Sequence, residues 1–503
     1  MTTMMTNRER QGGPSDLHPL VAAIAREVRQ AGGRAFLVGG FVRDLVARRI
    51  AGDSRPPAGH EIDLEVYGLA PQTLVPALGR FGEVRLVGES FAVYKLAAGN
   101  AAVEDEEGAP PTVIDVSLPR RDTKVAPGHR GFQVAGDPNL SFEEATRRRD
   151  FTINAMMHDP LTGETIDLWG GEADLRAGLI RAVDPDTFVE DSLRVLRAVQ
   201  FAARFEFRID SATVDLCRRI DLGDLPPERI WGEFEKLLLR AARPSLGLEW
   251  ADRLGVIDRL FPELAALKGC PQEPEWHPEG DVWTHTLLAL DRARKDEIEG
   301  LPREKQLAVL LAVLCHDFGK PATTSVVEGR IRSYEHEAAG IAPTRAFLDR
   351  LRIRTLGGYD LSAQVIELVA HHLAPSHFHK NRESVGDGAF RRLAARLEPE
   401  LLYRVSRADC LGRTGSFSTE AQEWFIARAR ALGVEERPPR PILLGRHLLS
   451  LGLAPGPRIG RIVRAVYEMQ LDGRVDDLEA ALREARRLIG EEAAGPPDAL
   501  PGR

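Results

Sequence analysis

Acidic side chains recur at every second position of one short apolar segment, a pattern that suits divalent cations. Glu61, Asp63 and Glu65 alternate with residues typical of a β-strand, so their carboxylates are expected on one face of that strand. Three acids on an otherwise apolar strand are costly unless water or metal ions meet them. Carboxylate oxygens are the ligands that Mg²⁺ prefers, and two such ions can align a triphosphate with an attacking 3′-hydroxyl group.

A further carboxylate has to come from a neighbouring strand. Asp115 lies in the apolar run Val113–Val116 and is the candidate by sequence. A solvated residue at a sheet edge is the alternative interpretation of this aspartate. We predict that Glu61, Asp63 and Asp115 form the catalytic set, with Glu61 and Asp63 as the Mg²⁺ ligands.

A pair of glycines precedes the acidic strand. Leu37 and Val38 end a predicted strand, Gly39 and Gly40 follow, and residues 41–46 continue with a helical pattern. Backbone N–H groups in such a turn meet no Cβ atom and lie at a helix N-terminus, where they can hold phosphate. The two glycines alone fit an ordinary strand-to-helix turn equally well. The acids that follow favour phosphate binding.

An acid and a base close together in the sequence offer a way to select a nucleobase without a template. Residues 190–194 read as helical, which puts Asp191 and Arg194 on one face. If exposed, they would form an ordinary ion pair that contributes little. In a nucleotide pocket they would present an acceptor beside a donor. That edge matches cytosine and adenine, whereas uracil and guanine would leave both partners unpaired.

Histidines and aspartates in the C-terminal half form a second set of candidate ligands. His285, the adjacent pair His316 and Asp317, and Asp409 lie in apolar helical segments. An adjacent His-Asp pair is expensive to bury unless a metal ion compensates. The set resembles the His…His-Asp…Asp pattern of HD phosphohydrolases, which implies a divalent transition metal such as Ni²⁺, Mn²⁺ or Co²⁺. The candidates for a second metal site there are His336, His372 and His371.

The elements that must carry these residues change character once along the chain. Short β-like runs broken by Gly and Pro occupy about 34–182, and nearly every segment from about 186 has helical spacing. We predict an α/β head followed by an all-α remainder. The predicted domains are disordered tails at 1–16 and 491–503, a head at 17–185, a helical neck at 186–262, a metal-binding domain at 263–436 and a helical unit at 437–490.

Composition limits the class of protein. The chain of 503 residues is too long for one core, and 43% hydrophobic residues suffice for two to four domains. It shows no membrane span and no secretion signal, so the cytoplasm is the expected location. Four scattered cysteines argue against a disulfide framework or a zinc ribbon. A net charge of -8 does not advertise a nucleic-acid binder, although a local basic stripe would be enough.

In this order and spacing, the motifs resemble those of class II tRNA nucleotidyltransferases (CCA-adding enzymes) of the bacterial type with an HD domain, and of bacterial poly(A) polymerases. The resemblance spans about 34–485. It implies an α+β fold with a polymerase β-like nucleotidyltransferase head of mixed sheet and helices, then an all-α neck, an HD domain and a C-terminal helical unit. Gly68 fixes the register that maps the family's metal-binding pair onto Glu61 and Asp63. The family usually has Asp at the first position, and Glu is one methylene longer.

The resemblance also implies which residues bind the nucleotide. The segment 148–154 matches the family motif for ribose selection, and 190–194 matches the motif that selects the base, with Glu190 supporting its neighbours. The expected nucleotide-binding residues are Gly39, Gly40, Arg43, Arg148, Arg149, Asp150, Asn154, Glu190, Asp191, Arg194 and Arg197.

The implied activity is Mg²⁺-dependent, template-independent addition of C, C and A to tRNA 3′ ends from CTP and ATP, with tRNA and the two nucleotides as partners and no membrane. The HD domain would hydrolyse 2′,3′-cyclic phosphates or phosphate monoesters. Poly(A) polymerase and CC- or A-adding variants are the close alternatives, and the HD set favours tRNA because poly(A)-tailing relatives generally lack it. An alternative of another class is an HD phosphohydrolase whose head binds RNA but is inactive, for which Glu61 is the one supporting feature.

Overall fold

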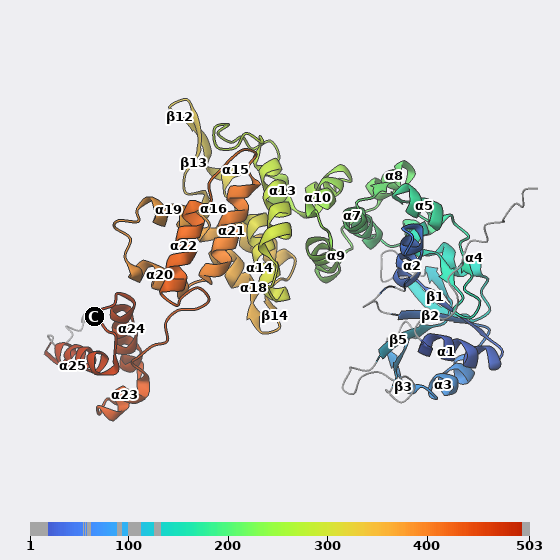
Figure 1. Ribbon diagram of the computed structural model, residues 1–503, viewed down its shortest axis with the longest axis horizontal. Helices are drawn as coiled ribbons and strands as arrows, with labels where there is room; N and C mark the ends of the chain where they lie inside the picture. Colours follow the sequence, from blue (N-terminus) through green and yellow to red (C-terminus); the bar gives the residue numbers. More distant parts are fainter. Residues whose placement is uncertain are drawn as a thin grey trace, which may run out of the picture. The chain divides into compact units, whose positions relative to one another are not determined.

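The chain forms two compact units in a computed structural model that describes residues 19–53, 55, 57, 62–87, 93–98, 112–124 and 132–494. The first unit is Met1–Leu237 with Leu246–Leu260, and the second is Leu238–Ser245 with Phe261–Arg503 (Figure 1). The finer domain boundaries stay predictions. Among the described residues, no helix is long and apolar enough to cross a bilayer.

A mixed seven-stranded sheet organises the first unit. Its strands in spatial order are β3 (Gly82–Val87), β4 (Val93–Ala98), β5 (Thr112–Ser117), β2 (Ile62–Tyr67), β1 (Arg34–Val38), β8 (Met157–His158) and β9 (Thr165–Ile166). Only β2 and β5 pair in parallel within this sheet of the described chain; its other neighbours are antiparallel. A separate antiparallel ribbon consists of β6 (Arg120–Lys124) and β7 (Phe132–Gly136). The mixed sheet confirms the predicted α+β character of the head.

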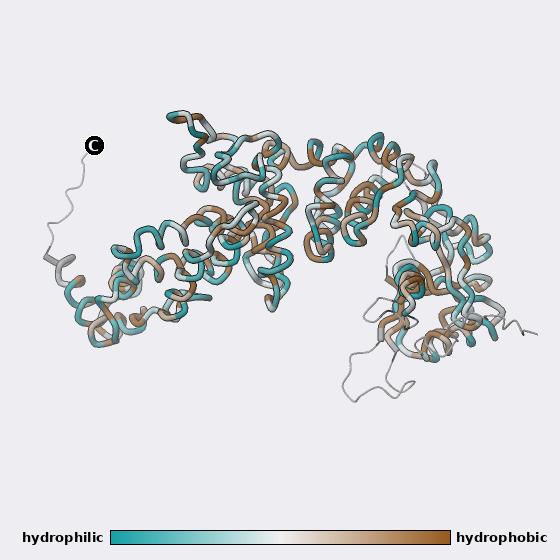
Figure 2. The backbone as a smooth tube through the Cα atoms, turned by 45° about the horizontal axis from the view of Figure 1, so that its top comes forward, coloured by the Kyte–Doolittle hydropathy of each residue, from teal (hydrophilic) through white to brown (hydrophobic). Residues whose placement is uncertain are grey.

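Helices pack on this sheet through apolar faces. Helix α1 buries Leu20, Ile24 and Val28, which recur at the spacing of one helical face. The head helices are α1 (Pro19–Gln30), α2 (Gly40–Ile50), α3 (Pro71–Leu78), α4 (Phe142–Arg147), α5 (Gly171–Ala177) and α6 (Pro185–Phe188). The helices that follow are α7 (Leu193–Phe205), α8 (Ser211–Arg219), α9 (Pro227–Arg240), α10 (Pro244–Arg253) and α11 (Val256–Leu260). Hydrophobic residues (brown) and hydrophilic residues (teal) alternate along the helical turns in Figure 2, as expected of amphipathic helices.

A bundle of helices forms most of the second unit. Its centre is α14 (Arg303–Cys315), whose residues from Leu307 to Cys315 are all buried, because this helix is apolar on every side. The helices α13 (Val282–Arg292), α18 (Leu361–His371) and α21 (Pro399–Gly412) pack around it. The remaining helices of the bundle are α12 (Pro262–Ala265), α15 (Lys320–Thr323), α16 (His336–Ala339), α17 (Ile341–Arg350), α19 (Ala374–Lys380), α20 (Asp387–Ala394) and α22 (Glu420–Ala431).

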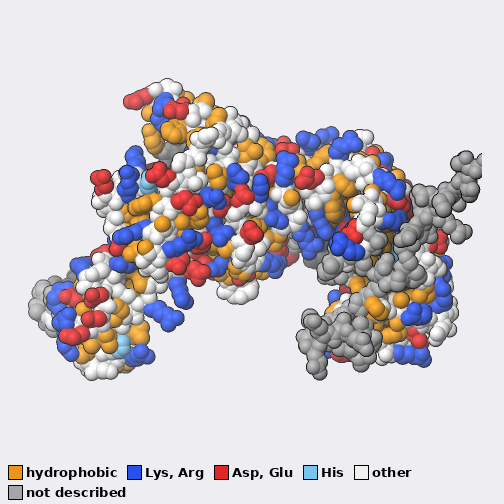
Figure 3. Space-filling view, in the orientation of Figure 1, with side chains coloured by type: hydrophobic (Ala, Val, Ile, Leu, Met, Phe, Trp, Pro, Cys, Tyr) orange, Lys and Arg blue, Asp and Glu red, His pale blue; other side chains and the backbone are white. Residues whose placement is uncertain are grey.

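Short strands interrupt the part predicted to be all-α, so that prediction was wrong in detail. Strands β12 (Thr324–Val327) and β13 (Arg330–Ser333) form a hairpin, and β14 (Thr355–Leu356) pairs with β15 (Tyr359–Asp360). Strand β10 (Leu179–Ile180) also pairs with β11 (Arg208–Ile209). Glu328 and Gly329 join β12 to β13 with φ angles of 52° and 75°, as a type I′ turn requires. Hydrophobic side chains are exposed over this hairpin (Figure 3).

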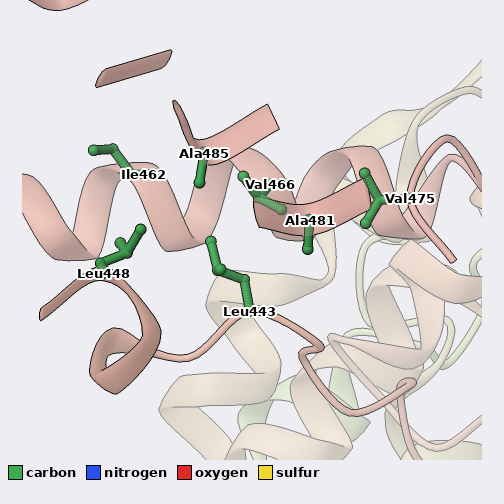
Figure 4. Packing of buried hydrophobic residues seen from close by; sticks show 7 residues of the cluster. All are labelled: Leu443, Leu448, Ile462, Val466, Val475, Ala481 and Ala485. Carbon is green, nitrogen blue, oxygen red and sulfur yellow. The ribbon is translucent and has the colours of Figure 1, made fainter. Parts of the chain in front are cut away.

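The C-terminal helices enclose an apolar cluster of their own. They are α23 (Gly445–Ser450), α24 (Pro457–Leu471) and α25 (Leu478–Ala494). Figure 4 shows the buried side chains that meet between them, and this cluster comprises Leu443, Leu448, Ile462, Val466, Val475, Ala481 and Ala485.

Candidate functional site

The parallel strand pair brings two of the predicted catalytic carboxylates together. Asp63 on β2 is the register partner of Asp115 on β5, and adjacent strands lie about 4.8 Å apart. The sequence placed Asp115 on a strand beside Asp63, and the register agrees. Lys95 on β4 is the register partner of Asp115 from the other side, with its Nζ atom 3.1 Å from the carboxylate. Glu61 lies outside the described residues.

The glycine turn lies directly against this pair. Strand β1 ends at Val38, and helix α2 begins at Gly40, as predicted. Gly39 has φ 70° and ψ -139°, a conformation that side chains with a Cβ rarely adopt. A Cβ atom at this position would lie 3.5 Å from Asp63 Oδ2. The glycine therefore keeps open the space between the acidic pair and the N-terminus of α2.

Glu65, the third acid on the face of β2, is buried and bonded within the protein. Tyr67 donates its hydroxyl hydrogen to Glu65 Oε1 at 2.5 Å, and Arg149 reaches Glu65 Oε2 at 3.4 Å. Burial and the neighbouring carboxylate raise the pKa of Tyr67 well above its usual value, so this phenol stays protonated. Glu65 therefore orients Arg149, which also lies beside Gly39.

A buried chain of polar residues lies behind the turn. Arg43, only 3% exposed, donates to Asn154 Oδ1 at 2.9 Å, and Asn154 donates to Asp150 at 3.0 Å. Arg197 on α7 closes the chain with two contacts to Asp150 Oδ2, at 2.7 and 2.6 Å. Burial alone would raise the pKa of Asp150, but the charge of Arg197 and the hydrogen bond from Asn154 hold it below its usual value. These four predicted nucleotide contacts form one connected network within the protein.

The predicted base-selecting segment is not one helix, so that prediction was wrong. Helix α7 begins at Leu193, and Glu190 and Asp191 precede it. Asp191 Oδ1 accepts a hydrogen bond from Leu193 N at 3.1 Å, which satisfies this backbone donor from outside the helix. Asp191 Oδ2 pairs with Arg229 at 3.2 Å. The acid is thus held before the helix rather than on its face.

Arg194 is fixed by backbone carbonyls. Its guanidinium donates to Thr187 O at 2.6 Å and to Arg148 O at 2.5 Å. Two carbonyl acceptors hold the planar group in one orientation without neutralising its charge. Arg194 is therefore a pre-oriented donor next to the ribose-motif segment that contains Arg148.

The second unit gathers all the HD residues into one buried cluster. His285 Nε2 lies 3.1 Å from Asp409 Oδ1, and His316 Nε2 lies 3.1 Å from Asp317 Oδ2. His336 Nε2 lies 3.4 Å from Asp317 Oδ1. Three sets of described residues have ligand atoms within 4.8 Å of one another: His285 with His316 and Asp409, Asp317 with His336 and His372, and His277 with Glu279 and His285. His371 instead bonds the carbonyl oxygen of Glu367.

Backbone contacts orient three of the histidine rings of the cluster. The Nδ1 atoms of His316, His336 and His372 each contact a backbone carbonyl three residues earlier, at 2.7, 2.9 and 2.8 Å. Such contacts place the proton on Nδ1 and leave Nε2 as a ligand. Burial and the neighbouring His336 lower the pKa of His372 to about 3, which keeps this ring neutral. Burial alone would lower the pKa of His316, but the charge of Asp317, which lies 3.1 Å from its Nε2 atom, raises it above its usual value.

Glu279 and His277 belong to this cluster and were missed from sequence. Glu279 Oε1 lies 2.8 Å from His285 Nδ1 and 2.9 Å from His277 Nδ1. Its other oxygen accepts from Thr414 N at 3.2 Å. Burial opposes ionisation of Glu279, but its hydrogen bonds with His285, with backbone and with His277 together outweigh burial and lower the pKa to about 2. The residues lie in the Pro- and Gly-rich segment 269–280, which has no helical or strand periodicity.

A cleft of about 230 Å³ opens onto the cluster. Its lining includes Asp317, His336, His372 and Asp409 from the metal-ligand sets. Cationic side chains also line it, among them Lys320, whose Nζ atom lies 2.8 Å from Asp317 Oδ2. The other lining cations are Arg332 and Arg413.

Comparisons with known protein families agree with the head and the segment after it. Residues 35–181 match the model of the poly A polymerase head domain. Residues 206–268 match the model described as the probable RNA and SrmB-binding site of polymerase A. Neither match reaches the buried histidine cluster.

A solved structure resembles the chain over most of its length. It is the CCA-adding enzyme of Bacillus stearothermophilus in complex with CTP, with a TM-score of 0.60 at 20% identity over 95% of this chain and all of that one. At this identity the likeness supports the fold alone, and it agrees with the predicted polymerase β-like architecture.

Sequence relatives are similar over nearly their whole lengths. The multifunctional CCA protein of Laribacter hongkongensis is 34% identical over 407 residues, which cover 78% of this chain and 89% of the relative. The multifunctional CCA protein of Halorhodospira halophila is 36% identical over 447 residues, which cover 85% of this chain and 94% of the relative. These matches confirm the resemblance drawn from the motifs, and the chain belongs to the family of the multifunctional CCA proteins.

Proposed function

We propose that this protein adds C, C and A to the 3′ ends of tRNA in the cytoplasm, using CTP and ATP and no nucleic-acid template. The observation that carries the proposal is the register pairing of Asp63 with Asp115 beside the open Gly39 turn. Membership of the family of multifunctional CCA proteins supplies the tRNA end as the acceptor.

The residues around the turn have complementary tasks in this reaction. Asp63, Asp115 and, by sequence, Glu61 would hold Mg²⁺, which supplies positive charge to the triphosphate and polarises the 3′-hydroxyl group. The backbone N–H groups at the start of α2 would hold phosphate oxygens. Arg149, oriented by Glu65, would contact the ribose or the triphosphate. The network from Arg43 to Arg197 would keep this surface in place.

Selection of the base would rest on two groups that the protein already orients. Arg194 is held as a donor by two backbone carbonyls, and Asp191 as an acceptor by Arg229 and Leu193 N. Cytosine and adenine each offer an amino donor beside a ring acceptor, which matches this pair. Uracil and guanine would leave buried groups unpaired, which costs about 1–3 kcal/mol for each group.

The test is an assay on tRNAs that end before CCA, after C and after CC. Each nucleoside triphosphate is supplied singly and then in mixture, and the product ends are sequenced. We expect the enzyme to incorporate C from CTP at the first two ends and A from ATP at the third. Asp63→Asn should abolish addition, whereas Glu83→Gln, an exposed acid on the same sheet, should not. Long tracts of A would support a poly(A) polymerase instead.

We also propose that the buried cluster is a metal-dependent phosphohydrolase site. His285, His316, Asp317 and Asp409, with His336 and His372, would hold transition metal ions such as Ni²⁺, Mn²⁺ or Co²⁺, which would supply a polarised water molecule. The convergence of histidine Nε2 atoms and buried carboxylates supports this proposal. Lys320 and Arg413 would balance the charge of a phosphate group in the cleft.

Metal content and activity test the second site independently of the first. Protein stripped by a chelator is dialysed against each metal ion, and bound metal is measured by mass spectrometry. We expect wild-type protein to retain metal and to hydrolyse adenosine 2′,3′-cyclic phosphate. His316→Ala should lose both properties but keep nucleotide addition. If His316→Ala retains metal stoichiometrically, the cluster is not the binding site. If the wild type hydrolyses phosphate but Mg²⁺ supports no addition, the head is inactive.

A further inference from the structure

The cleft over the histidine cluster carries an aromatic residue held at a fixed place on its wall. Trp276 lies in a turn in which Trp276 N and His277 N both donate to Glu273 O, at 3.0 and 2.9 Å. His277 is then bound to Glu279, which also holds His285 of the metal cluster. One end of the turn is thus connected to the metal ligands.

The hairpin β12–β13 holds the other end of the same turn. Ile331 N donates to Glu273 Oε2 at 2.9 Å. Arg330 pairs with Glu275, and its guanidinium also lies 3.8 Å from Glu273. The turn is therefore fastened on two sides, which fixes the backbone from which the Trp276 side chain extends into the cleft.

Trp276 is held in place but not covered by protein. Its side chain is 46% exposed, and it lines the same cleft as Asp317, His336 and His372. Arg332 on β13 lines this cleft as well. Burial of the indole in the core does not explain its placement, because about half of its surface faces solvent. A planar ring and a guanidinium beside the candidate metal ligands form a surface on which a nucleobase can stack.

We propose that Trp276, aided by Arg332, binds the nucleobase of a terminal nucleotide whose phosphate group lies at the metal cluster. The proposal rests on the phosphohydrolase function proposed above and names what that site recognises. The HD cleft thereby distinguishes nucleotides at RNA ends from phosphate esters that lack a base. Trp276 is a specificity residue of the cleft, and His277 and Glu273 position it.

The proposal is tested with two phosphate monoesters that differ in the presence of a base. The full-length protein loaded with Ni²⁺ is assayed for hydrolysis of adenosine 2′-monophosphate and of glycerol 2-phosphate. Trp276→Ala should raise KM for the nucleotide about 5-fold to about 150-fold, the range of base-aromatic stacking, with kcat nearly unchanged. The kinetic constants for glycerol 2-phosphate should not change. Trp276→Phe should restore most of the nucleotide affinity.

Tyr334→Ala is the matched control, because Tyr334 is a 65% exposed aromatic residue of the same unit that does not line the cleft. This variant should resemble the wild type with both esters. Equal losses on both esters in Trp276→Ala would mean that the tryptophan supports the fold of the cleft, and the stacking proposal would be wrong. An unchanged KM for the nucleotide would overturn it as well.

A binding measurement separates this proposal from the phosphohydrolase function. If the wild type hydrolyses neither ester, the proposed hydrolysis fails, and calorimetry with adenosine 2′-monophosphate and Ni²⁺-loaded protein still tests the stacking. Binding by the wild type that weakens at least 5-fold in Trp276→Ala would support a nucleotide-binding cleft. Absence of binding, or equal binding by both proteins, would overturn it.

Discussion

The Nε2 atoms of His336 and His372 face each other at 3.3 Å inside the second unit. Each ring contacts a backbone carbonyl through Nδ1, from Ser333 and Val369 respectively, and so carries its proton on that side. At this distance the two Nε2 atoms can share one proton in a hydrogen bond. They can also bind one metal ion between them, as proposed above for this cluster.

Metal binding should stabilise the second unit, and neighbouring histidines provide the test. At a Ni²⁺ concentration about 100 times the Kd, the gain is about 2.7 kcal/mol, visible as a rise in Tm. His372→Ala should abolish most of this rise. His371→Ala should keep it, because His371 belongs to none of the ligand sets that the described residues form. The same rise in both variants would place the ion elsewhere. The measurement is differential scanning fluorimetry with and without chelator.

Gly39→Ala should impair nucleotide addition more than it impairs folding. The substitution strains a residue at φ 70° by about 1–2 kcal/mol and places a methyl group 3.5 Å from Asp63 Oδ2. A displaced triphosphate should lower kcat/KM on the order of 100-fold. Gly52→Ala is the control, since its φ is 80° and no atom lies within 4 Å of the added carbon. If both variants lose activity equally, strain alone accounts for the effect.

Arg194→Lys should weaken discrimination among bases. Lysine keeps the charge but cannot donate to the two carbonyls of Thr187 and Arg148 in the plane that a base requires. We expect the preference for CTP over UTP, measured as a ratio of kcat/KM, to fall about 5-fold to about 150-fold. Arg218→Lys is the control, because Arg218 also donates to a backbone carbonyl, that of Arg253. An unchanged ratio in Arg194→Lys would argue against base contact.

The first unit should lose stability in mild acid because of one buried histidine. Burial, and then the charge of Arg49, lowers the pKa of His158 to about 4. The unfolded chain, with a pKa near 6.5, takes up the proton first as pH falls, so the folded state loses about 3 kcal/mol between about pH 6.5 and about pH 4. His158→Gln should flatten this part of the urea-unfolding profile. If the free energy of unfolding falls equally in the wild type and in His158→Gln, other groups cause the loss of stability.

Much of the first site could be predicted because a strand has a simple period. Alternation placed Asp63 and Glu65 on one face of β2, and an apolar run placed Asp115 on a strand. The parallel register that makes Asp63 and Asp115 neighbours depends on how distant segments pair. Local sequence does not encode such pairing. It also does not reveal that Tyr67 and Arg149 engage Glu65, since these contacts form only when the sheet is assembled.

The misplaced and missed residues share a cause, which is side-chain bonding to the backbone or between loops. Asp191 was assigned to a helix because its spacing from Arg194 is helical, but its carboxylate bonds Leu193 N from before the helix. Glu279 and His277 lie in a loop without periodicity, so nothing marked them until the fold placed them against His285. Among the HD residues, His285 and Asp409 lie in apolar helices, where a polar residue is conspicuous, and His316 and Asp317 follow directly after one.

Helix α14 is enclosed by apolar side chains on every side. Amide hydrogens between Leu307 and Cys315 should exchange with deuterium only when the bundle opens as a whole. His316 and Asp317 follow directly at the end of this slowly exchanging segment. If the cluster binds metal as proposed, packing around α14 holds these two ligands in position before an ion arrives.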